Sequence, residues 1–472
     1  MSTASARYTN GSIFGHISTL SITSAIGLFA LFAVDLVDVL FIAMLGVPEL
    51  AAAVGFAGAG LFFGAAIGIG LAIASSTLVA QAIGAGDRDE ASRLATHGLL
   101  YGLCWTIPIT IATLVYAREL FTLIGATGNT LDLAVQYFRI VGASLPILGL
   151  AMAATSLLRA VGEARLSMWA TIIGGLVNAV LDPLLIFTFS LGLRGAATAS
   201  VISRITVAAV ALYYVYRRHQ LLKRPVGKQF LSDVAQLNSI AIPSLATNLS
   251  GPVGAAWATS QMARYGTDAV AAAAVIGRLT PVAFAGIYGL SGAVGPIASQ
   301  NVGAANWGRV RETLYAAAQF VLLYVLPVSI LLYAARDLLV TIFELEGDAA
   351  ELLRFYCTFI VASYALFGLQ LAANPLFTAL RNPVLATFSN VLRDLCLGIP
   401  LVLLGSMMFG ARGVLAGQAL GNALAGIIAF AVALVLVRRT ERDGALLPPV
   451  LSSLRRWHFH RHVVPGVQHR GH

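Results

Sequence analysis

The stretch QAIGAGD (81–87) occurs a second time, in altered form, as QNVGAAN (300–306). Three further blocks repeat in the same order and at nearly the same separation. They are AMLGVPELAAAVG (43–55) with ARYGTDAVAAAAV (263–275), LLRAVGEA (157–164) with LFTALRNP (376–383), and GLRGAA (192–197) with GARGVL (410–415). Four blocks in one order predict that the chain contains two copies of one structural unit.

The composition indicates a membrane protein. Hydrophobic residues make up 58% of the 472 residues and charged residues only 11%, whereas soluble domains are about a quarter charged. A formal net charge of +9 could suggest a nucleic-acid partner. The basic residues gather in loops beside apolar runs, however, which is the placement that membrane topology requires, so we expect no nucleic-acid partner. The phosphate-binding pattern GxxxxGK[ST] is absent from the sequence, so we expect no ATP-driven activity.

Six apolar runs long enough to cross a bilayer precede a polar stretch, RRHQLLKRPVGKQFLSD (217–233), and six follow it. Because six is an even number, the two copies cross the membrane in the same orientation. The sequence therefore predicts an all-α integral membrane protein with twelve transmembrane helices, in two pseudo-symmetric six-helix lobes around a central cavity. The predicted spans are 15–44, 50–83, 94–117, 131–158, 166–191, 195–216, 237–263, 269–302, 312–335, 350–380, 384–409 and 412–437.

The distribution of Lys and Arg predicts the topology. Twenty of the thirty lie in the N-terminus, the even-numbered loops and the C-terminal tail, and five lie in the odd-numbered loops if Arg412, the first residue of the last span, is counted with them. Positive residues stay on the cytoplasmic side, so we expect both termini in the cytoplasm. The predicted parts are a cytoplasmic N-terminus (1–14), an N-lobe (15–216), a cytoplasmic linker (217–236), a C-lobe (237–438) and a cytoplasmic basic tail (439–472).

Several motifs occur in an order and spacing typical of one transporter family. They are VDVLFIAMLGVPELAAA (37–53), QAIGAGDRDEA (81–91), NAVLDPLLIF (178–187), MARYGTDAVAAAAVIGRL (262–279) and SQNVGAANWGRVR (299–311). On the basis of these motifs, the chain resembles the multidrug and toxic compound extrusion (MATE) family over roughly residues 15–438. The NxxxDP block resembles the prokaryotic branch related to DNA-damage-inducible protein F.

The resemblance implies a secondary antiporter rather than an enzyme. Such a protein exports organic cations or amphiphilic drugs by alternating access, in exchange for H⁺ or Na⁺, and needs no cofactor. It also implies a multi-pass protein of the bacterial inner membrane, surrounded by lipid and functional as a monomer.

Four acidic residues lie deep in the predicted spans: Asp35, Asp38, Asp182 and Asp394. An ionisable group at the centre of a transmembrane helix costs about 2.5–3.5 kcal/mol on insertion scales, so it normally faces protein or a wet cavity. Asp35 and Asp38 share one helix face, and Asn178 shares a face with Asp182. Carboxylates beside an amide can hold a small hard cation or share a proton.

The resemblance assigns Asp38, Asn178 and Asp182 to a cation-coupling site, which would also be where Na⁺ binds; no other metal site is expected. It places Tyr137 and Ser200 beside that site as supporting hydroxyls, with Ser200 where the family more often has Thr. The family motif does not require Asp35, which either lines the cavity or lies against a neighbouring helix.

In the second half, Asp394 adjoins Arg393, which favours an internal ion pair over a second ion site. Asp394 and Arg278 are also candidates for lining a C-lobe cavity. Arg278 has no counterpart in the first half, and it either lines that cavity or ties a backbone carbonyl. We therefore expect coupling to reside in the N-lobe.

The tail RRWHFHRHVVPGVQHRGH (455–472) contains five of the eight histidines, in a spacing that fits no closed metal site. A solvated cytoplasmic tail is the favoured interpretation, with Trp457 and the arginines beside it able to rest on anionic headgroups.

Two other functions remain as alternatives. A lipid-linked oligosaccharide flippase of the same superfamily would need a more cationic central cavity than these acids suggest. A membrane enzyme acting on lipid phosphates would need clustered His, Asp and Arg near an interface, whereas the predicted spans hold only His16 and His97, each at a margin.

Overall fold

The computed structural model describes residues 6–45 and 47–448, and this part of the chain consists of helices and short connections. The first half contains α1 (Ile13–Ala43), α2 (Pro48–Gly84), α3 (Arg88–Val115), α4 (Ala117–Leu123), α5 (Gly128–Gly142), α6 (Leu145–Ala160), α7 (Ala164–Pro183) and α8 (Leu193–Tyr213). The second half contains α9 (Gly227–Met262), α10 (Thr267–Ala283), α11 (Ala285–Gly303), α12 (Trp307–Ile342), α13 (Gly347–Phe355), α14 (Tyr364–Ala379), α15 (Pro383–Val391) and α16 (Gly398–Asp443).

The described helices account for twelve membrane crossings. Eight helical segments are long and apolar enough to cross a membrane, and the bent pairs α5–α6 and α10–α11 raise that number to ten. The segment formed by α15 and α16 turns back on itself and therefore crosses twice. The last crossing is α9, whose 36 residues span about 54 Å against a hydrocarbon core of about 30 Å. The predicted all-α fold with twelve spans is confirmed, and the chain is a multi-pass membrane protein.

The reversal inside α16 occurs at Gly410, whose φ of 61° and ψ of −141° are not helical. A Cβ on Gly405 would overlap the backbone carbonyl of Gly413, and a Cβ on Gly417 would overlap that of Leu401. Both pairs are centred on the same point in the chain, which is the contact pattern of two antiparallel helices joined there. Positive φ is accessible to glycine without the steric cost of a Cβ, so Gly410 permits this hairpin.

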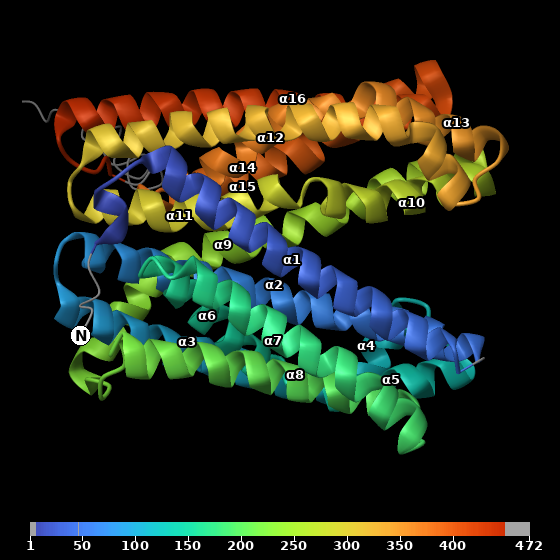
Figure 1. Cartoon of the computed structure of the whole chain (residues 1–472), viewed down its shortest axis with the longest axis horizontal. Coiled ribbons are helices and arrows are strands. Elements are labelled where there is room, and N and C mark those ends of the chain that lie inside the picture. The colour runs from blue at the N-terminus through green and yellow to red at the C-terminus, as the bar shows by residue number, and fades with distance from the viewer. Residues whose placement is uncertain (1–5, 46, 449–472) are drawn as a thin grey trace, which may run out of the picture.

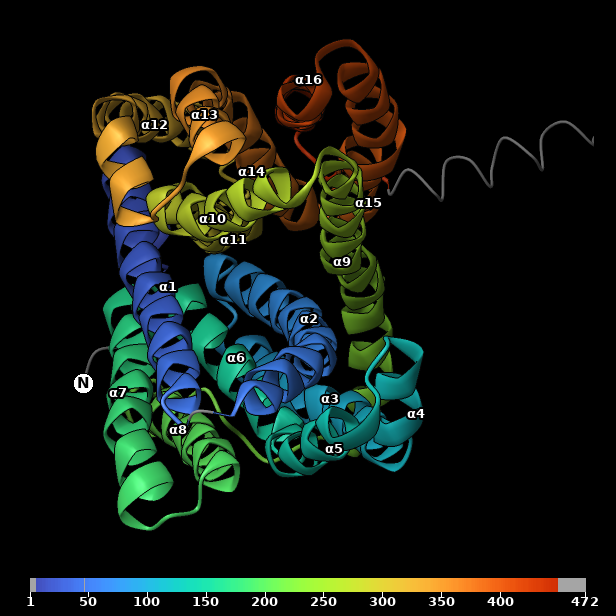
Figure 2. The same ribbon diagram turned by 90° about the vertical axis from the view of Figure 1, so that its right-hand side faces the viewer.

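The two halves of the chain occupy two halves of the molecule. In Figure 1, α2 to α8 lie in the lower half and α10 to α16 in the upper half. Figure 2 shows α1 and α9 running along opposite sides and reaching both halves. In keeping with the repeat, α1 packs on α7 and also on α11 and α12, while α9 packs on α15 and α16 and also on α2 and α3. We call α1–α8 the N-lobe and α9–α16 the C-lobe.

The second lobe begins earlier than the hydrophobic pattern predicts. The sequence predicts a linker over 217–236, but α9 begins at Gly227 inside that range. Its first turns are polar and are tied to the N-lobe, because the Asp233 carboxylate accepts from Arg93 Nε at 3.0 Å and lies 2.6 Å from His97 Nδ1. Apolar runs mark only the part of a helix that faces hydrocarbon, so they cannot locate helical turns that continue beyond it.

The lobes meet where the repeated QAIGAGD and QNVGAAN blocks end α2 and α11. A Cβ on Gly84 would overlap the Gln300 carbonyl, and a Cβ on Gly303 would overlap the Gln81 carbonyl. The side chains reciprocate: Gln81 Nε2 donates to the Ala379 carbonyl at 2.9 Å, and Gln300 Nε2 donates to that of Ala160 at 2.7 Å. We call this end of the molecule the closed end. The repeated blocks QAIGAGD and QNVGAAN of the two copies therefore contact each other at the closed end.

The N-terminal segment also crosses the closed end. The backbone N–H of Tyr8 donates to Gln300 Oε1 at 2.9 Å, and its carbonyl accepts from Asn301 Nδ2 and Arg309 Nη2, both at 3.1 Å. Its buried hydroxyl donates to the Arg159 carbonyl of the N-lobe at 3.1 Å. Tyr8 thus joins both lobes at the same end.

Candidate functional site

A hydrogen-bonded cluster of three polar side chains joins α1 to α7 within the N-lobe. The two hydrogens of Asn178 Nδ2 go to different carboxylates, Asp38 Oδ1 at 2.7 Å and Asp182 Oδ2 at 2.9 Å. Asn178 and Asp182 lie one turn apart on α7, which packs against α1 where Asp38 lies. The structure therefore brings together the three residues that the sequence singled out. We call Asp38, Asn178 and Asp182 the N-lobe cluster.

The chemistry of the N-lobe cluster is that of a site for a small cation or a proton. Asp182 is fully buried and its Oδ1 has no hydrogen-bond partner among the described residues. Two carboxylates that share one amide donor in a low-dielectric interior repel each other unless positive charge lies between them. Among the described residues, the hydrogen bonds to Asp38 and Asp182 come from Asn178, and no salt bridge joins either acid to a Lys or Arg.

The two supporting residues lie on neighbouring helices of the same lobe. Tyr137 on α5 is buried and lies within electrostatic reach of Asp38 and Asp182, and its hydroxyl is close to Ser200 on α8. The backbone of Asp35 belongs to α1, one turn before Asp38, but its side chain is outside the described part of the structure. Whether Asp35 lines a cavity therefore stays a prediction.

The acid of the C-lobe has a different environment. Asp394 forms a two-pronged ion pair with the preceding residue, Arg393 Nε donating to Oδ1 at 2.7 Å and Nη2 to Oδ2 at 2.9 Å. The two side chains are only 10% and 12% exposed. Both lie in a π-helical turn, Leu392–Leu397, between α15 and α16. π-Helical turns are rare and are frequently found at functional sites.

The ion pair lines a cavity of about 280 Å³ in the lobe where the sequence suggested one, with Asp394 and Arg278 as its candidate residues. Asp394 contributes to its wall, whereas Arg278 is exposed on α10 and is not among the lining residues. The lining side chains that carry aromatic rings, charge or amide groups are Trp257, Tyr288, Tyr364, Phe367, Arg393, Asp394, Gln418 and Asn422. We call this space the C-lobe cavity. Its walls come from five segments of the chain. The sequence repeat pairs Asp38 with Ala258, which lies beside Trp257 in this wall.

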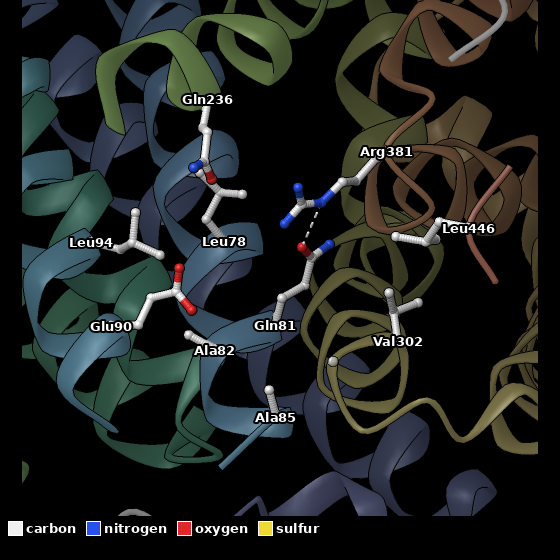
Figure 3. Close-up of a pocket in the computed structure, with 11 residues that line it drawn as sticks. Leu78, Gln81, Ala82, Ala85, Glu90, Leu94, Gln236, Val302, Arg381 and Leu446 are labelled. Atoms are coloured by element: carbon white, nitrogen blue, oxygen red, sulfur yellow. Dashed lines mark hydrogen bonds between the residues drawn. The ribbon is translucent and has the colours of Figure 1, made fainter. Parts of the chain in front are cut away.

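A smaller cavity of about 170 Å³ lies at the closed end (Figure 3). Arg381 and Gln81 point toward each other across it, with Arg381 Nε donating to Gln81 Oε1 at 3.0 Å. The carboxylate of Glu90 and the amide of Gln236 also line it. The hydrogen bond from Arg381 to Gln81 in this cavity joins the C-lobe to the N-lobe.

Comparison with known proteins gives one consistent family. The MatE family model matches residues 24–184 and 243–404. A FAD transporter from Shewanella oneidensis is 27% identical over 420 residues, covering 88% of this chain and 93% of that protein. Multidrug export protein MepA from Staphylococcus aureus is 24% identical over 382 residues, covering 79% of this chain and 83% of that protein.

Solved structures agree with this fold. The crystal structure of the Vibrio cholerae MATE transporter VcmN, determined as a mutant, superposes with a TM-score of 0.86 at 26% identity, covering 90% of this chain and 97% of that one. An outward-facing multidrug resistance MATE family transporter has the same TM-score at 23% identity, covering 94% of this chain and all of that one, which shows the fold alone.

Proposed function

The chain belongs to the MatE family of membrane transporters, and on that basis we propose that it is a secondary antiporter. It exports amphiphilic organic compounds by alternating access in exchange for H⁺ or Na⁺. Members of this family are transporters rather than enzymes. The observation that carries the proposal is the N-lobe cluster, where two carboxylates inside a membrane-spanning lobe share one amide and form no salt bridge within the described part of the chain.

Coupling follows from the position of the N-lobe cluster between α1 and α7. Without a bound cation or proton, the repulsion between Asp38 and Asp182 favours an arrangement that separates the two helices. Binding of H⁺ or Na⁺ removes that repulsion and favours the packed arrangement. Since α1 also packs on α11 and α12 of the C-lobe, a shift of α1 alters the contact between lobes. The ion acts only through its different affinity for the two arrangements.

The position of the closed end indicates the side of the membrane from which substrate cannot enter in this arrangement. The lobes contact each other where α2 and α11 end, and the N-terminal segment crosses the same end. The excess of basic residues on that side of the spans supports a cytoplasmic location for both termini, in the inner membrane of a bacterium. The arrangement described here is then closed toward the cytoplasm. The protein functions as a monomer, and lipid surrounds its exposed apolar side chains.

The substrates we propose are amphiphilic compounds with planar aromatic rings. One of the two relatives is named as a multidrug export protein and the other as a FAD transporter, so the family scaffold accommodates more than organic cations. The flippase alternative needs unpaired cationic side chains, and the arginine that lines the C-lobe cavity is already paired with Asp394.

The test is transport by the purified chain in proteoliposomes, with a pH gradient and a Na⁺ gradient imposed separately. A cationic fluorescent dye reports the flux. The unaltered protein should respond to at least one gradient, and Asp38→Asn and Asp182→Asn should each lower the coupled rate by about tenfold or more, since hydrogen bonds to charged groups contribute about 1.5–3 kcal/mol.

The matched control is Asp132→Asn, which makes the same chemical change in an exposed surface ion pair with Arg118. It should retain the coupled rate, because surface pairs contribute little. Normal coupling in both N-lobe variants would refute the proposed role of the cluster.

A further inference from the structure

We propose that the C-lobe cavity binds the planar heteroaromatic ring of a transported substrate, through a ring edge that carries hydrogen-bond acceptors. The inference rests on the proposed transport function, and it assigns the substrate ring to a place other than the N-lobe cluster. A fused ring such as the isoalloxazine of a flavin belongs to this class. An alkyl chain and a quaternary ammonium group do not.

The walls of the C-lobe cavity offer flat aromatic surfaces held in fixed positions. Tyr364 stacks on Phe284, with ring centroids 4.2 Å apart and planes within 2°. Phe367 meets Tyr364 edge-on at 5.8 Å and Tyr288 edge-on at 6.1 Å. The Arg393 guanidinium lies 5.3 Å from the centre of Phe367 and fixes it from another side. Rings that are ordered before binding lose little freedom when a planar ligand packs against them.

Two side chains in the wall of the cavity have donors without an acceptor, while the lining amides of Gln418 and Asn422 offer both a donor and an acceptor. Trp257 Nε1 is buried and has no partner among the described residues. Arg393 uses Nε and Nη2 for Asp394 and Nη1 for Gln370, at 3.3 Å. A guanidinium carries five N–H groups, so each terminal nitrogen retains one N–H without an acceptor in the described part of the chain. Unused donors beside aromatic walls select a ligand with acceptor atoms in the plane of its ring.

The charge balance of the C-lobe cavity excludes an organic cation as its ligand. Asp394 is neutralised by Arg393 within the wall, so the C-lobe cavity presents no free carboxylate to an organic cation. A purely apolar ligand would leave the donors of Trp257 and Arg393 unpaired, at a cost in free energy. A neutral or anionic heteroaromatic ring satisfies both conditions.

The size and shape of the cavity fit this class of ligand. An engineered cavity of about 150 Å³ accommodates one benzene molecule, so about 280 Å³ accommodates a fused two-ring system. A third ring can extend past Gln418, which is exposed at the rim. The backbone of α9 closely approaches Asp394, since a Cβ on Gly254 would lie 3.1 Å from Asp394 Cβ. Aromatic walls with a few placed polar groups are typical of small-molecule sites.

The test is binding of riboflavin to the full chain in detergent without any ion gradient, followed by the fluorescence anisotropy of the flavin. Trp257→Phe keeps a ring but removes the indole N–H, and should weaken binding by about three- to tenfold. Ala258→Ile adds volume to the wall of the cavity and should abolish saturable binding. The control Trp169→Phe changes an exposed tryptophan on α7 outside the cavity and should leave binding unchanged.

The outcomes separate this inference from the proposed function. Asp38→Asn should bind riboflavin normally while losing gradient-driven transport. The C-lobe site is overturned if the unaltered protein shows no saturable binding, or if Trp257→Phe and Ala258→Ile both bind riboflavin as tightly as the unaltered protein. Either result leaves the antiport proposal standing. Binding that depends on Trp257 in a protein without gradient-driven transport refutes antiport and supports the C-lobe site. Both variants should elute like the parent on size exclusion, which separates lost binding from misfolding.

Discussion

The N-lobe cluster and the C-lobe cavity lie at related places in the two copies of the repeat, yet their charges differ. The N-lobe cluster joins α1 to α7, and the C-lobe cavity lies where α9 meets the π-helical turn after α15. In the first, two carboxylates share one amide; in the second, one carboxylate is paired with an arginine. The comparison indicates that one scaffold supports either an ion site or a neutral aromatic cavity, depending on where the positive charge comes from.

The source of the positive charge has energetic consequences. A buried carboxylate is tolerated when hydrogen bonds and an opposite charge compensate for lost hydration. Arg393 supplies both within the C-lobe, so the Asp394 carboxylate is compensated without any ligand. The N-lobe cluster is completed by an ion from solution in our proposal, and its stability should depend on that ion. Variants that remove one charge should therefore affect the two lobes in opposite ways.

The largest expected effect follows from removing the arginine. Arg393→Gln leaves Asp394 buried without its charge partner, which should lower the free energy of unfolding by about 3–5 kcal/mol. Asp182→Asn in the N-lobe removes one of two like charges and should leave stability unchanged or raise it. Thermal unfolding of both variants in detergent, followed by tryptophan fluorescence, measures the difference.

The double variant Arg393→Gln with Asp394→Asn is the control for this comparison. It removes both charges together, so it should recover most of the stability lost in Arg393→Gln. Equal melting temperatures for Arg393→Gln and Asp182→Asn would contradict the distinction between the lobes.

The next effect concerns the amide in each lobe. Asn178→Leu removes both donors to Asp38 and Asp182, and should weaken coupling-ion activation of transport by about tenfold or more, since such charged hydrogen bonds contribute about 1.5–3 kcal/mol. Gln370→Leu removes the donors to Ser389 and Asn390 and the acceptor for Arg393.

Gln370→Leu should lower thermal stability by about 1–3 kcal/mol through unsatisfied buried groups. It should leave the ion dependence of transport unaltered. The two properties are measured on the same preparations. A changed ion dependence in Gln370→Leu would mean that the C-lobe takes part in coupling.

Much of this fold could be predicted from the sequence, for a physical reason. Crossing a bilayer requires about twenty apolar residues, so twelve apolar runs identify twelve crossings. The repeat blocks also predict which segments correspond, and the Gln81 and Gln300 contacts are reciprocal as a repeat implies. The missed features are those that apolar length does not encode, such as the early start of α9 at Gly227 and the π-helical turn at Leu392–Leu397.

The candidate sites divide in the same way. The i, i+4 spacing places Asn178 and Asp182 on one face of a helix, but the contact with Asp38 depends on tertiary packing and came only from the family resemblance. The C-lobe cavity needs side chains from α9, α11, α14 and α16 at one point, and no local pattern marks such a meeting. Trp257 is consequently a residue that structure finds and sequence does not.

A smaller effect tests whether the two copies are equivalent where they touch. Gln81→Leu removes the donor to the Ala379 carbonyl and the acceptor for Arg381, whereas Gln300→Leu removes the donor to the Ala160 carbonyl and the acceptor for the Tyr8 N–H. Each neutral bond should contribute about 0.5–1.5 kcal/mol to the closed end and the bond from the charged Arg381 more, so Gln81→Leu should have the larger effect. Distance distributions between spin labels on the two lobes measure the fraction of open molecules. A larger effect from Gln300→Leu would contradict this order and would mean that the contact of Tyr8 outweighs that of Arg381.

The smallest effect comes from His219, which follows α8 in the connection between the lobes. Burial lowers the pKa of His219, and Arg218 and Arg88 lower it further, while Glu163 opposes them. Since its pKa is lower in the folded chain than the usual 6.5, the unfolded chain binds more protons there, and stability falls as pH drops below about 6.5. His219→Gln should flatten that part of the stability profile, measured by thermal unfolding between pH 5 and 8, without changing the pH dependence of transport. Loss of pH-dependent transport in His219→Gln would move proton sensing from the N-lobe cluster to the connection between the lobes.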